Sequence, residues 1–237
     1  MSPLSKKKSA DEPYKRRLYG RKQTRPPGKE RQGHMDSLLP RLQLEIKDGE
    51  TLKPAALFPR QYSQLWLEIG FGNGEHLAEL IRRHPDRAFI GAEPFINGMG
   101  AFLKHIANDP LDLIRVWMDD AIFLVNALPD ACLDGIYVLN PDPWPKKRHA
   151  KRRIISRENL DRFARVLKPD AELILATDVD PLADWMTIQT CNHSAFAWQA
   201  ERVSDWRVAP ADWIPTRYEQ KGRKAGRRQT YLLFKRI

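Results

Sequence analysis

The chain has 237 residues, a length that corresponds to one α/β domain with an additional tail. It carries 40 Lys and Arg against 30 Asp and Glu, a net charge of +10, and its 42% of hydrophobic residues is enough to form a core. A mini-protein held together by disulfides is therefore excluded, and a soluble, basic globular protein is expected.

The two cysteines, Cys132 and Cys191, are far apart and form no Cys-x-x-Cys motif, so neither a disulfide framework nor a structural zinc site is predicted. No segment approaches the roughly 18 consecutive apolar residues of a membrane span. Arg16-Arg17 is not followed by the apolar stretch of an export signal. We therefore expect a cytoplasmic protein in a reducing compartment, with no membrane partner.

Basic residues are concentrated in three segments. Residues 1–33 carry a net charge of +8, residues 146–153 carry +6 and residues 217–236 carry +7, which leaves −11 for the rest of the chain. Solvated surfaces usually intersperse the two signs, so this segregation indicates a polyphosphate partner, most simply a nucleic acid. The composition of residues 1–35 predicts a basic tail that is disordered in the free protein. A tail that only confers solubility is the alternative.

After the tail, short apolar segments alternate with amphipathic ones. Strands are predicted at residues 64–70, 88–93, 113–118, 134–139 and 171–177, with a last, antiparallel strand at 229–234. Helices are predicted between them, at residues 75–83, 96–107, 121–128 and 157–167. This alternation is typical of an α/β fold with a mostly parallel sheet, helices on both faces, and a ligand site at the carboxyl ends of the strands.

Three glycines, Gly70, Gly72 and Gly74, follow the first predicted strand where it meets a helix. They let the backbone turn tightly and approach a ligand. The spacing differs from the dinucleotide fingerprint Gly-x-Gly-x-x-Gly, and Glu75 at the start of the helix would compete with a pyrophosphate for the amide donors. Glu93, about 20 residues further on, is placed to accept hydrogen bonds from both hydroxyls of a ribose.

A nucleoside without a phosphate fits this pattern better than a nicotinamide cofactor does, and S-adenosylmethionine is such a ligand. Its ribose would suit Glu93, its adenine would lie near Asp119-Asp120, and its positively charged methionyl end would suit Glu68. Three of these acidic residues have a structural alternative. Glu93 would then be a capping carboxylate before Pro94, and Asp119 or Asp120 would be the N-cap of the next helix.

Residues 140–153 read Asn-Pro-Asp-Pro-Trp-Pro-Lys-Lys-Arg-His-Ala-Lys-Arg-Arg and follow the fourth predicted strand. The three prolines stiffen the backbone and prevent a helix, so Asp142 and Trp144 would be presented on a rigid turn with a basic track directly behind. Trp144 would either stack on a base or anchor the loop. A carboxylate, an aromatic ring and phosphate-binding charge are the components needed to hold a nucleotide.

Pro-Asp-Pro-Trp followed by Lys146, Arg148-His149 and Lys151-Arg152-Arg153 resembles the tRNA (guanine-N7-)-methyltransferase family. Further motifs occur in the family's order: Glu68-Ile69-Gly70 with Gly72 and Gly74, Gly91-Ala92-Glu93, Asp120-Ala121, Thr177-Asp178 and Thr216-Arg217-Tyr218-Glu219. The resemblance covers about residues 64–236, and the loop motif is highly specific. The chain departs from many relatives at Asn140, where they have Phe, and at Arg217-Tyr218, where they have Lys-Phe.

This resemblance implies a Rossmann-like class I methyltransferase fold with a mostly parallel seven-stranded sheet, in a single domain over residues 36–237. It also implies S-adenosylmethionine as the methyl donor, S-adenosylhomocysteine as its product, and N7 of a guanine in the variable loop of tRNA as the acceptor. Neither a metal nor an obligate protein partner is expected. A monomer is the default, because the sequence has no heptad seam or extended apolar stripe.

The resemblance also implies roles for individual residues. The donor site would comprise Glu68, Gly70, Gly72, Gly74, Glu93, Asp120 and Asp142, with Asp142 also catalytic. Substrate contacts would come from Lys146, Asp178, Thr216, Arg217, Tyr218 and Glu219. Further RNA contacts would come from Arg148, Lys151, Arg152 and Arg153.

Guanine N7 carries a lone pair and no proton, so its methylation needs no general base, and positioning is expected to dominate. Asp142 is predicted to orient the guanine and to stabilise the positive charge that develops on it. Two other functions stay open. One is methylation of an amino group, whose enzymes have an Asp/Asn-Pro-Pro-aromatic loop; the extra loop residue and the basic track disfavour it. The other is RNA binding without catalysis, which the set of Glu68, Glu93 and Asp142 disfavours.

Overall fold

The computed structural model describes residues 18–19, 23–24 and 26–237. The predicted disorder of the basic tail falls largely on residues 1–17, 20–22 and 25, which lie outside the described residues. Helix α1 (Lys29–Ser37) spans the predicted boundary after residue 35, and its Glu30 Oε2 lies 2.7 Å from Lys104 Nζ of helix α5 (Ile96–His105). The division into a tail of residues 1–35 and one domain of residues 36–237 stays a prediction.

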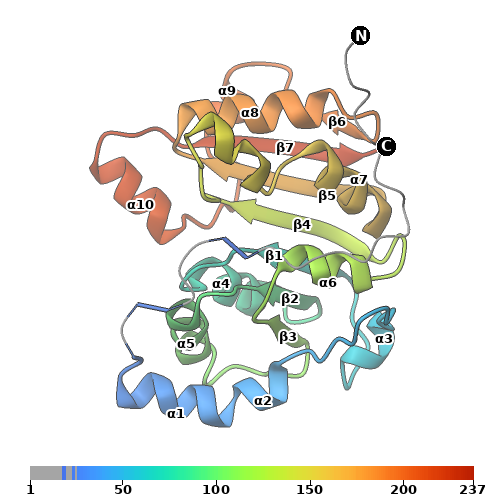
Figure 1. The fold of residues 1–237 in the computed structure, drawn as a ribbon, viewed down its shortest axis with the longest axis vertical. Coiled ribbons are helices and arrows are strands. Elements are labelled where there is room, and N and C mark those ends of the chain that lie inside the picture. The colour runs from blue at the N-terminus through green and yellow to red at the C-terminus, as the bar shows by residue number, and fades with distance from the viewer. Residues whose placement is uncertain (1–17, 20–22, 25) are drawn as a thin grey trace.

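A seven-stranded sheet forms the centre of the molecule, in the order β3-β2-β1-β4-β5-β7-β6 (Figure 1). The strands are β1 (Leu65–Ile69), β2 (Ala88–Ala92), β3 (Ile114–Trp117), β4 (Leu133–Leu139), β5 (Leu167–Thr177), β6 (Phe196–Trp198) and β7 (Thr230–Arg236). Strands β1 to β5 pair in parallel, whereas β7 is antiparallel to both of its neighbours, β5 and β6. The predicted mostly parallel sheet with a last antiparallel strand is confirmed.

Helices cover both faces of this sheet. Besides α1 and α5, they are α2 (Leu39–Leu42), α3 (Pro54–Leu57), α4 (Glu75–Arg83), α6 (Ala121–Ala127), α7 (Arg157–Val166), α8 (Asp180–Cys191), α9 (Ser204–Arg207) and α10 (Arg217–Lys224). Buried side chains of α6, α7 and α8 share one core cluster with Leu67 of β1, and those of α4 and α5 share a second cluster with Trp66. Since successive strand residues point to opposite faces, the two clusters lie on opposite sides of the sheet.

The predicted helices and strands are all present, with ends that differ by at most a few residues. The described residues also form elements that were given no range in the prediction, namely α1, α2, α3, α8, α9, α10 and β6. Pro181 lies in the first turn of α8, where a missing N–H costs nothing, so this proline does not mark the end of a helix. Helix α10 is polar along its length and buries only Glu219 and Gly222, so it lacks the apolar periodicity that indicates a helix in a sequence.

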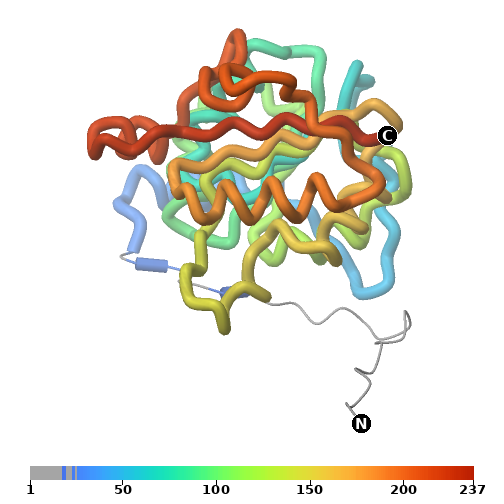
Figure 2. Tube along the Cα trace, turned by 90° about the horizontal axis from the view of Figure 1, so that it is seen from above, coloured from blue at the N-terminus to red at the C-terminus, as the bar shows by residue number. Residues whose placement is uncertain are grey.

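The carboxyl ends of the parallel strands point toward the end of the molecule that carries α10 (Figure 1). Figure 2 shows the loop after β4, in yellow, and α10, in red, at this same end. The fold thus places the two segments with the most specific family motifs beside the carboxyl ends of the strands, where ligands bind in α/β sheets.

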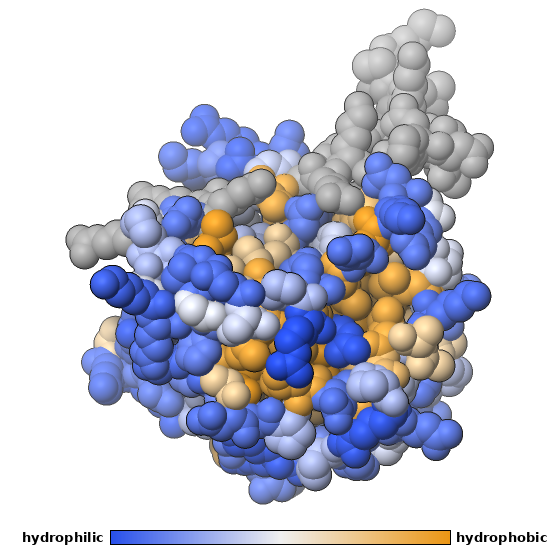
Figure 3. Space-filling model, turned by 90° about the horizontal axis from the view of Figure 1, so that it is seen from below, coloured by the Kyte–Doolittle hydropathy of each residue, from blue (hydrophilic) through white to orange (hydrophobic). Residues whose placement is uncertain are grey.

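The end of the molecule that carries α1 and α2 has apolar residues in its middle, surrounded by hydrophilic ones (Figure 3). Leu38 and Leu42 from this segment are buried in the second core cluster. Leu44 N then donates to Val116 O of the edge strand β3 at 2.9 Å, which covers that edge. Among the residues that the structure describes, no helix is both long enough and apolar enough to cross a membrane.

Candidate active site

Three acidic residues lie at the carboxyl ends of neighbouring strands. Glu68 is the penultimate residue of β1, Glu93 directly follows β2, and Asp142 is the third residue after β4. Since β1 lies between β2 and β4, the fold brings these carboxylates to one edge of the sheet. Burial raises the pKa of Glu93 above its ordinary value, and the negative charges of Asp142 and Glu68 also raise it. Two backbone hydrogen bonds to the carboxylate act in the opposite direction and lower the pKa in part. Glu93 thus lies within electrostatic range of both Asp142 and Glu68.

The glycine turn after β1 is attached to Glu93. Gly72 N donates to Glu93 Oε2 at 2.8 Å, and Phe95 N, just before α5, donates to Oε1 at 2.9 Å. Gly72 and Gly74 have φ angles of +60° and +79°, and a Cβ on Gly74 would lie 2.5 Å from the Phe102 ring, so both positions favour glycine. Helix α5 begins after Phe95 without a side-chain cap, so Glu93 is not its N-cap, and ribose binding by the remaining lone pairs of Glu93 stays a prediction.

His76 of α4 holds the Glu68 carboxylate. Its Nδ1 lies 2.9 Å from Glu68 Oε2, and both side chains are buried. The imidazole also packs edge-on against Tyr137 of β4, with ring centroids 5.0 Å apart, and lies 6.0 Å from the Trp213 ring. Sequence reasoning assigned His76 no role. Its position in the first turn of the helix that follows the glycine turn, where a side chain faces back to the strand, is the signal that could have found it.

Two further residues predicted for the donor site, Gly70 and Asp120, make structural contacts. Gly70 N donates to Ala92 O at 2.7 Å, which joins the ends of β1 and β2. Asp120 is the N-cap of α6, and its Oδ1 accepts from Ile122 N at 2.9 Å. Asp119 Oδ1 in turn accepts from Asp120 N at 2.8 Å. The N-cap alternative for Asp120 is confirmed, and its contact with an adenine stays a prediction.

The proline-rich loop after β4 contains two residues with a left-handed backbone. Asn140 has a φ of +48° and Trp144 a φ of +42°, a conformation that few residues other than glycine adopt. Asn140 N donates to Ala176 O of β5 at 2.8 Å, which holds the start of the loop to the sheet. Asp142 lies exposed between them, and partial desolvation raises the pKa of its carboxyl above the ordinary value.

The basic segment behind this loop forms a short 3-10 helix, Lys147–Arg152. Its exposed side chains, with that of the preceding residue, are Lys146, Lys147, Arg148 and Lys151. Arg152 instead packs against two rings that contact each other, with its guanidinium carbon 4.7 Å from the centre of the Tyr19 ring and 4.9 Å from that of Trp144. Trp144 also packs edge-on against His149. Trp144 therefore has the contacts of a loop anchor, and its stacking on a base stays a prediction.

Arg153, the last of the predicted RNA contacts, is turned toward the loop. Its Nε donates to Pro143 O at 3.0 Å and its Nη2 to Trp144 O at 3.2 Å. The guanidinium carbon lies 4.6 Å from the centre of the Trp185 ring of α8. The structure thus separates Arg153 from the exposed basic residues that precede it.

The predicted substrate tetrapeptide, residues 216–219, begins helix α10. Thr216 is the N-cap, and its Oγ1 accepts from Glu219 N at 3.1 Å. Arg217 and Tyr218 follow as exposed side chains. Tyr218 lies over the glycine turn, since its Cε2 is 3.4 Å from the position that a Cβ would take on Gly72. The fold therefore brings the tetrapeptide to the predicted donor site.

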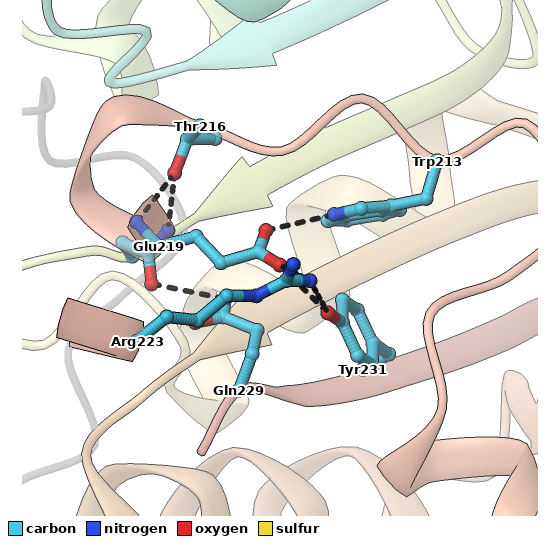
Figure 4. Close-up of polar contacts among 7 residues, drawn as sticks. Trp213, Thr216, Glu219, Arg223, Gln229 and Tyr231 are labelled. Atoms are coloured by element: carbon cyan, nitrogen blue, oxygen red, sulfur yellow. Dashed lines mark hydrogen bonds and ion pairs between the residues drawn. The ribbon is translucent and has the colours of Figure 1, made fainter. Parts of the chain in front are cut away.

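Glu219 points away from solvent into a polar cluster (Figure 4). Its Oε2 accepts from Trp213 Nε1 at 2.8 Å, and its Oε1 accepts from Tyr231 OH at 2.7 Å and from Arg223 Nη2 at 2.5 Å. Burial and the hydrogen bond to Glu219 raise the pKa of Tyr231 to about 12, so its phenol stays a donor at neutral pH. Glu219 thus attaches α10 to β7, and its predicted contact with the substrate stays a prediction.

Asn140 also connects the start of α10 to the sheet, and Asp178 binds the segment that follows α10. Asn140 Nδ2 donates to Thr216 Oγ1 at 3.0 Å, and its Oδ1 accepts from Gln229 Nε2 at 3.0 Å. Asp178, directly after β5, accepts from Arg227 Nε at 2.8 Å on its Oδ2. The Asn140 amide therefore bridges the loop after β4 and the start of α10.

Sequence reasoning missed several residues that hold this site together, namely His76, Trp213, Gln229 and Tyr231. They belong to no motif, and their roles depend on contacts between distant parts of the chain. Within residues 18–19, 23–24 and 26–237, no group of three or more His, Cys, Asp or Glu side chains is arranged to bind a metal ion. Cys132 and Cys191 are free thiols.

Comparison with known proteins agrees with this geometry. Residues 63–232 match the family model described as "Putative methyltransferase". The chain is 46% identical to a tRNA (guanine-N(7)-)-methyltransferase of Rhodospirillum rubrum, over 93% of this chain and 88% of the relative. It is 43% identical to the protein of the same name from Rhizobium meliloti, over 92% of this chain and 94% of the relative.

Solved structures with the same fold include the 16S rRNA methyltransferase KamB, with a TM-score of 0.56 and 15% identity over 80% of this chain and 96% of that one. TrmN from Thermus thermophilus has a TM-score of 0.51 and 14% identity, over 78% of this chain and 47% of that one. At these identities the likeness shows the fold alone. The sequence relatives and the family model identify the family as well as the fold. The chain belongs to the tRNA (guanine-N7-)-methyltransferase family, with the class I methyltransferase fold.

Proposed function

We infer that this enzyme transfers a methyl group from S-adenosylmethionine to N7 of a guanine in the variable loop of tRNA, with S-adenosylhomocysteine as the second product. The observation that carries this conclusion is the position of the Pro-Asp-Pro-Trp loop. It presents Asp142 at the same edge of the sheet as Glu68 and Glu93, with the basic segment 146–153 directly behind.

The residues at this edge suit S-adenosylmethionine. Its sulfonium and ammonium groups are cations, and the edge carries the carboxylates of Glu68, Glu93 and Asp142. Each oxygen of Glu93 accepts one backbone hydrogen bond and keeps a lone pair for a ribose hydroxyl. Gly72 has no side chain, whereas a Cβ at this position would lie 3.4 Å from Tyr218 Cε2. The glycine therefore leaves room for a ligand beside the turn. When bound, the donor supplies an electrophilic methyl group.

The protein's contribution to the reaction is positioning and charge. Guanine N7 has a lone pair and no proton, so no side chain has to remove one. Asp142 lies exposed on a loop stiffened by prolines, where it orients the purine and stabilises the positive charge that develops during transfer. Arg217, Tyr218 and Lys146 are exposed around this edge and contact the tRNA. Alignment of this kind contributes several kcal/mol, about 7–11 in the best model reactions.

The same proposal includes a monomeric, cytoplasmic enzyme that needs no metal. A nucleophile that already carries a free lone pair does not depend on a metal ion for activation. The two free thiols suit a reducing compartment. Sedimentation of the full chain with and without tRNA tests the monomer, and a turnover rate that does not change with a chelator tests the metal.

The product of the reaction identifies the function. The full chain is incubated with methyl-labelled S-adenosylmethionine and an unmodified tRNA transcript, and the RNA is digested to nucleosides. We expect the label in 7-methylguanosine. A matched transcript with 7-deazaguanine at the target position, which has a C–H in place of N7, should accept no label. Label in another nucleoside, or none despite donor binding, would contradict the proposal.

Donor affinity is expected to fall as the pH is lowered from 8 toward 5. The pKa values of Glu93 and Asp142 are both raised, so these carboxylates become protonated at a higher pH than ordinary ones and lose their attraction for a cation. Calorimetric titration across this range measures the effect. S-adenosylhomocysteine lacks the sulfonium charge and should show a weaker dependence. Equal pH dependence of the two ligands would refute the role of charge, provided that circular dichroism shows a folded protein throughout.

Arg148→Ala is expected to weaken tRNA binding and to reduce the slope of log K against log salt by about 1, because one phosphate contact is lost. Arg148 is exposed in the basic segment behind the catalytic loop. Filter binding at several salt concentrations measures the slope. Lys53→Ala is the matched control, since Lys53 is exposed beside α3, away from α10 (Figure 1). A slope identical to that of the wild type would remove Arg148 from the tRNA interface.

A further inference from the structure

The catalytic loop lacks the donors to stabilise its own backbone. Pro141, Pro143 and Pro145 have no N–H, and Trp144 adopts a left-handed conformation with a φ of +42°. Carbonyl groups in such a loop need a donor from elsewhere, because an unpaired backbone acceptor is unfavourable when it is shielded from water. The carbonyls of Pro143 and Trp144, the two residues directly after Asp142, both receive their hydrogen bond from Arg153.

Arg153 is itself held in place. Its guanidinium lies 4.6 Å from the centre of the Trp185 ring, on helix α8. Trp185 Nε1 donates to Ile155 O at 2.7 Å, and the Ile155 side chain is 1% exposed in the core. The guanidinium therefore connects the loop to a rigid part of the fold. A planar fork with several N–H groups suits two neighbouring carbonyls, which the single ammonium of Lys cannot match.

We propose that Arg153 is a positioning residue that acts through Asp142: it fixes the loop by its two hydrogen bonds and does not bind tRNA phosphate. The exposed neighbours Arg148 and Lys151 supply phosphate contacts, whereas Arg153 is half-buried with its Nε and one Nη turned inward. This inference depends on the proposed role of Asp142 in the methylation of guanine N7.

Arg153→Lys separates the two roles, because it keeps the positive charge and removes the fork. We expect the single-turnover rate constant, at saturating donor and tRNA, to fall about 10- to 100-fold, since misplacement by ~1 Å has an effect of this size. The Kd for tRNA and its salt slope should stay at the wild-type values. Arg148→Ala provides the contrast, since it should change the salt slope.

The opposite pattern would overturn the inference. If a folded Arg153→Lys variant keeps the single-turnover rate constant, the positioning role is wrong; if its Kd for tRNA rises at the same time, Arg153 is a tRNA contact. Arg157→Lys, an exposed residue at the start of α7, serves as the control for a substitution of the same kind. The wild type is measured in the same series. A wild type that methylates no guanine refutes the proposed function, whereas a failure confined to Arg153→Lys refutes only this inference.

Trp185→Leu tests the same connection if Arg153→Lys does not fold. It leaves both loop hydrogen bonds possible and removes the ring against the guanidinium. We expect a smaller fall in the single-turnover rate constant, about 3- to 10-fold by the same positional argument, with an unchanged salt slope of tRNA binding. An unchanged rate constant in a folded Trp185→Leu variant would overturn the inference.

Discussion

Asp142→Asn is expected to lower kcat for methylation of guanine N7 by about 100- to 1,000-fold, the loss typical of removing one preorganised electrostatic group from a transition state. Positive charge passes to the purine during transfer, and Asp142 is the exposed carboxylate of the loop at the carboxyl end of β4. Asparagine has nearly the same shape and keeps hydrogen bonding, so the loss reports the charge. Single-turnover kinetics at saturating donor and tRNA measures it.

Donor binding has to be measured in the same variant, because Asp142 is also proposed to belong to the donor site. Calorimetry of S-adenosylmethionine binding distinguishes weaker binding of the donor from loss of the catalytic group. Asp112→Asn is the matched control, since Asp112 is exposed before β3, at the opposite ends of the strands, and should leave kcat unchanged. If Asp142→Asn binds the donor and turns over at the wild-type rate, the catalytic role is wrong.

Glu219→Ala is expected to lower the free energy of unfolding by about 2–3 kcal/mol and to reduce activity strongly. The substitution removes the acceptor of Trp213 Nε1 and Tyr231 OH, and a buried donor without a partner costs about 1–3 kcal/mol. The bond to Arg223 adds little, since that side chain is 55% exposed. Activity falls because α10 carries Tyr218, which lies over the Gly72 turn. Urea unfolding measures the change in stability.

Two substitutions make this result specific. Glu219→Gln keeps the size and one acceptor oxygen and should lose less stability than Glu219→Ala. Tyr218→Phe, at the neighbouring exposed position, should leave the urea midpoint unchanged, since a surface change away from such networks alters stability by less than about 0.5 kcal/mol. If Glu219→Ala unfolds at the wild-type urea concentration, the cluster in Figure 4 does not hold α10 in place.

The two halves of the site share a continuous set of contacts. Glu68, predicted to bind the donor, pairs with His76, and the His76 ring lies 6.0 Å from Trp213. Trp213 in turn donates to Glu219 of the predicted substrate tetrapeptide. A residue that no motif marks, Trp213, therefore lies between the predicted donor and substrate sites, and substitutions there should affect both.

The sequence by itself determined the order of the elements and the edge of the sheet that carries the site. Buried strands such as Ala88–Ala92 are continuous apolar runs, and α4 has an amphipathic pattern, so both can be predicted from the sequence. Gly and Pro determine the backbone of the turn at Gly72 and Gly74 and of the stiff loop around Asp142. Their effects are local, so both features can be predicted from the sequence.

Only the tertiary structure decided how the polar side chains at this edge are used. Glu219 looks like an exposed residue of a basic segment, and burial against Trp213 and Tyr231 turns it into an anchor. Arg153 follows five other basic residues, yet its donors point to the loop. These partners are paired by packing between elements, and the direction of a side chain follows from that packing. Local periodicity and turn chemistry carry no information about it.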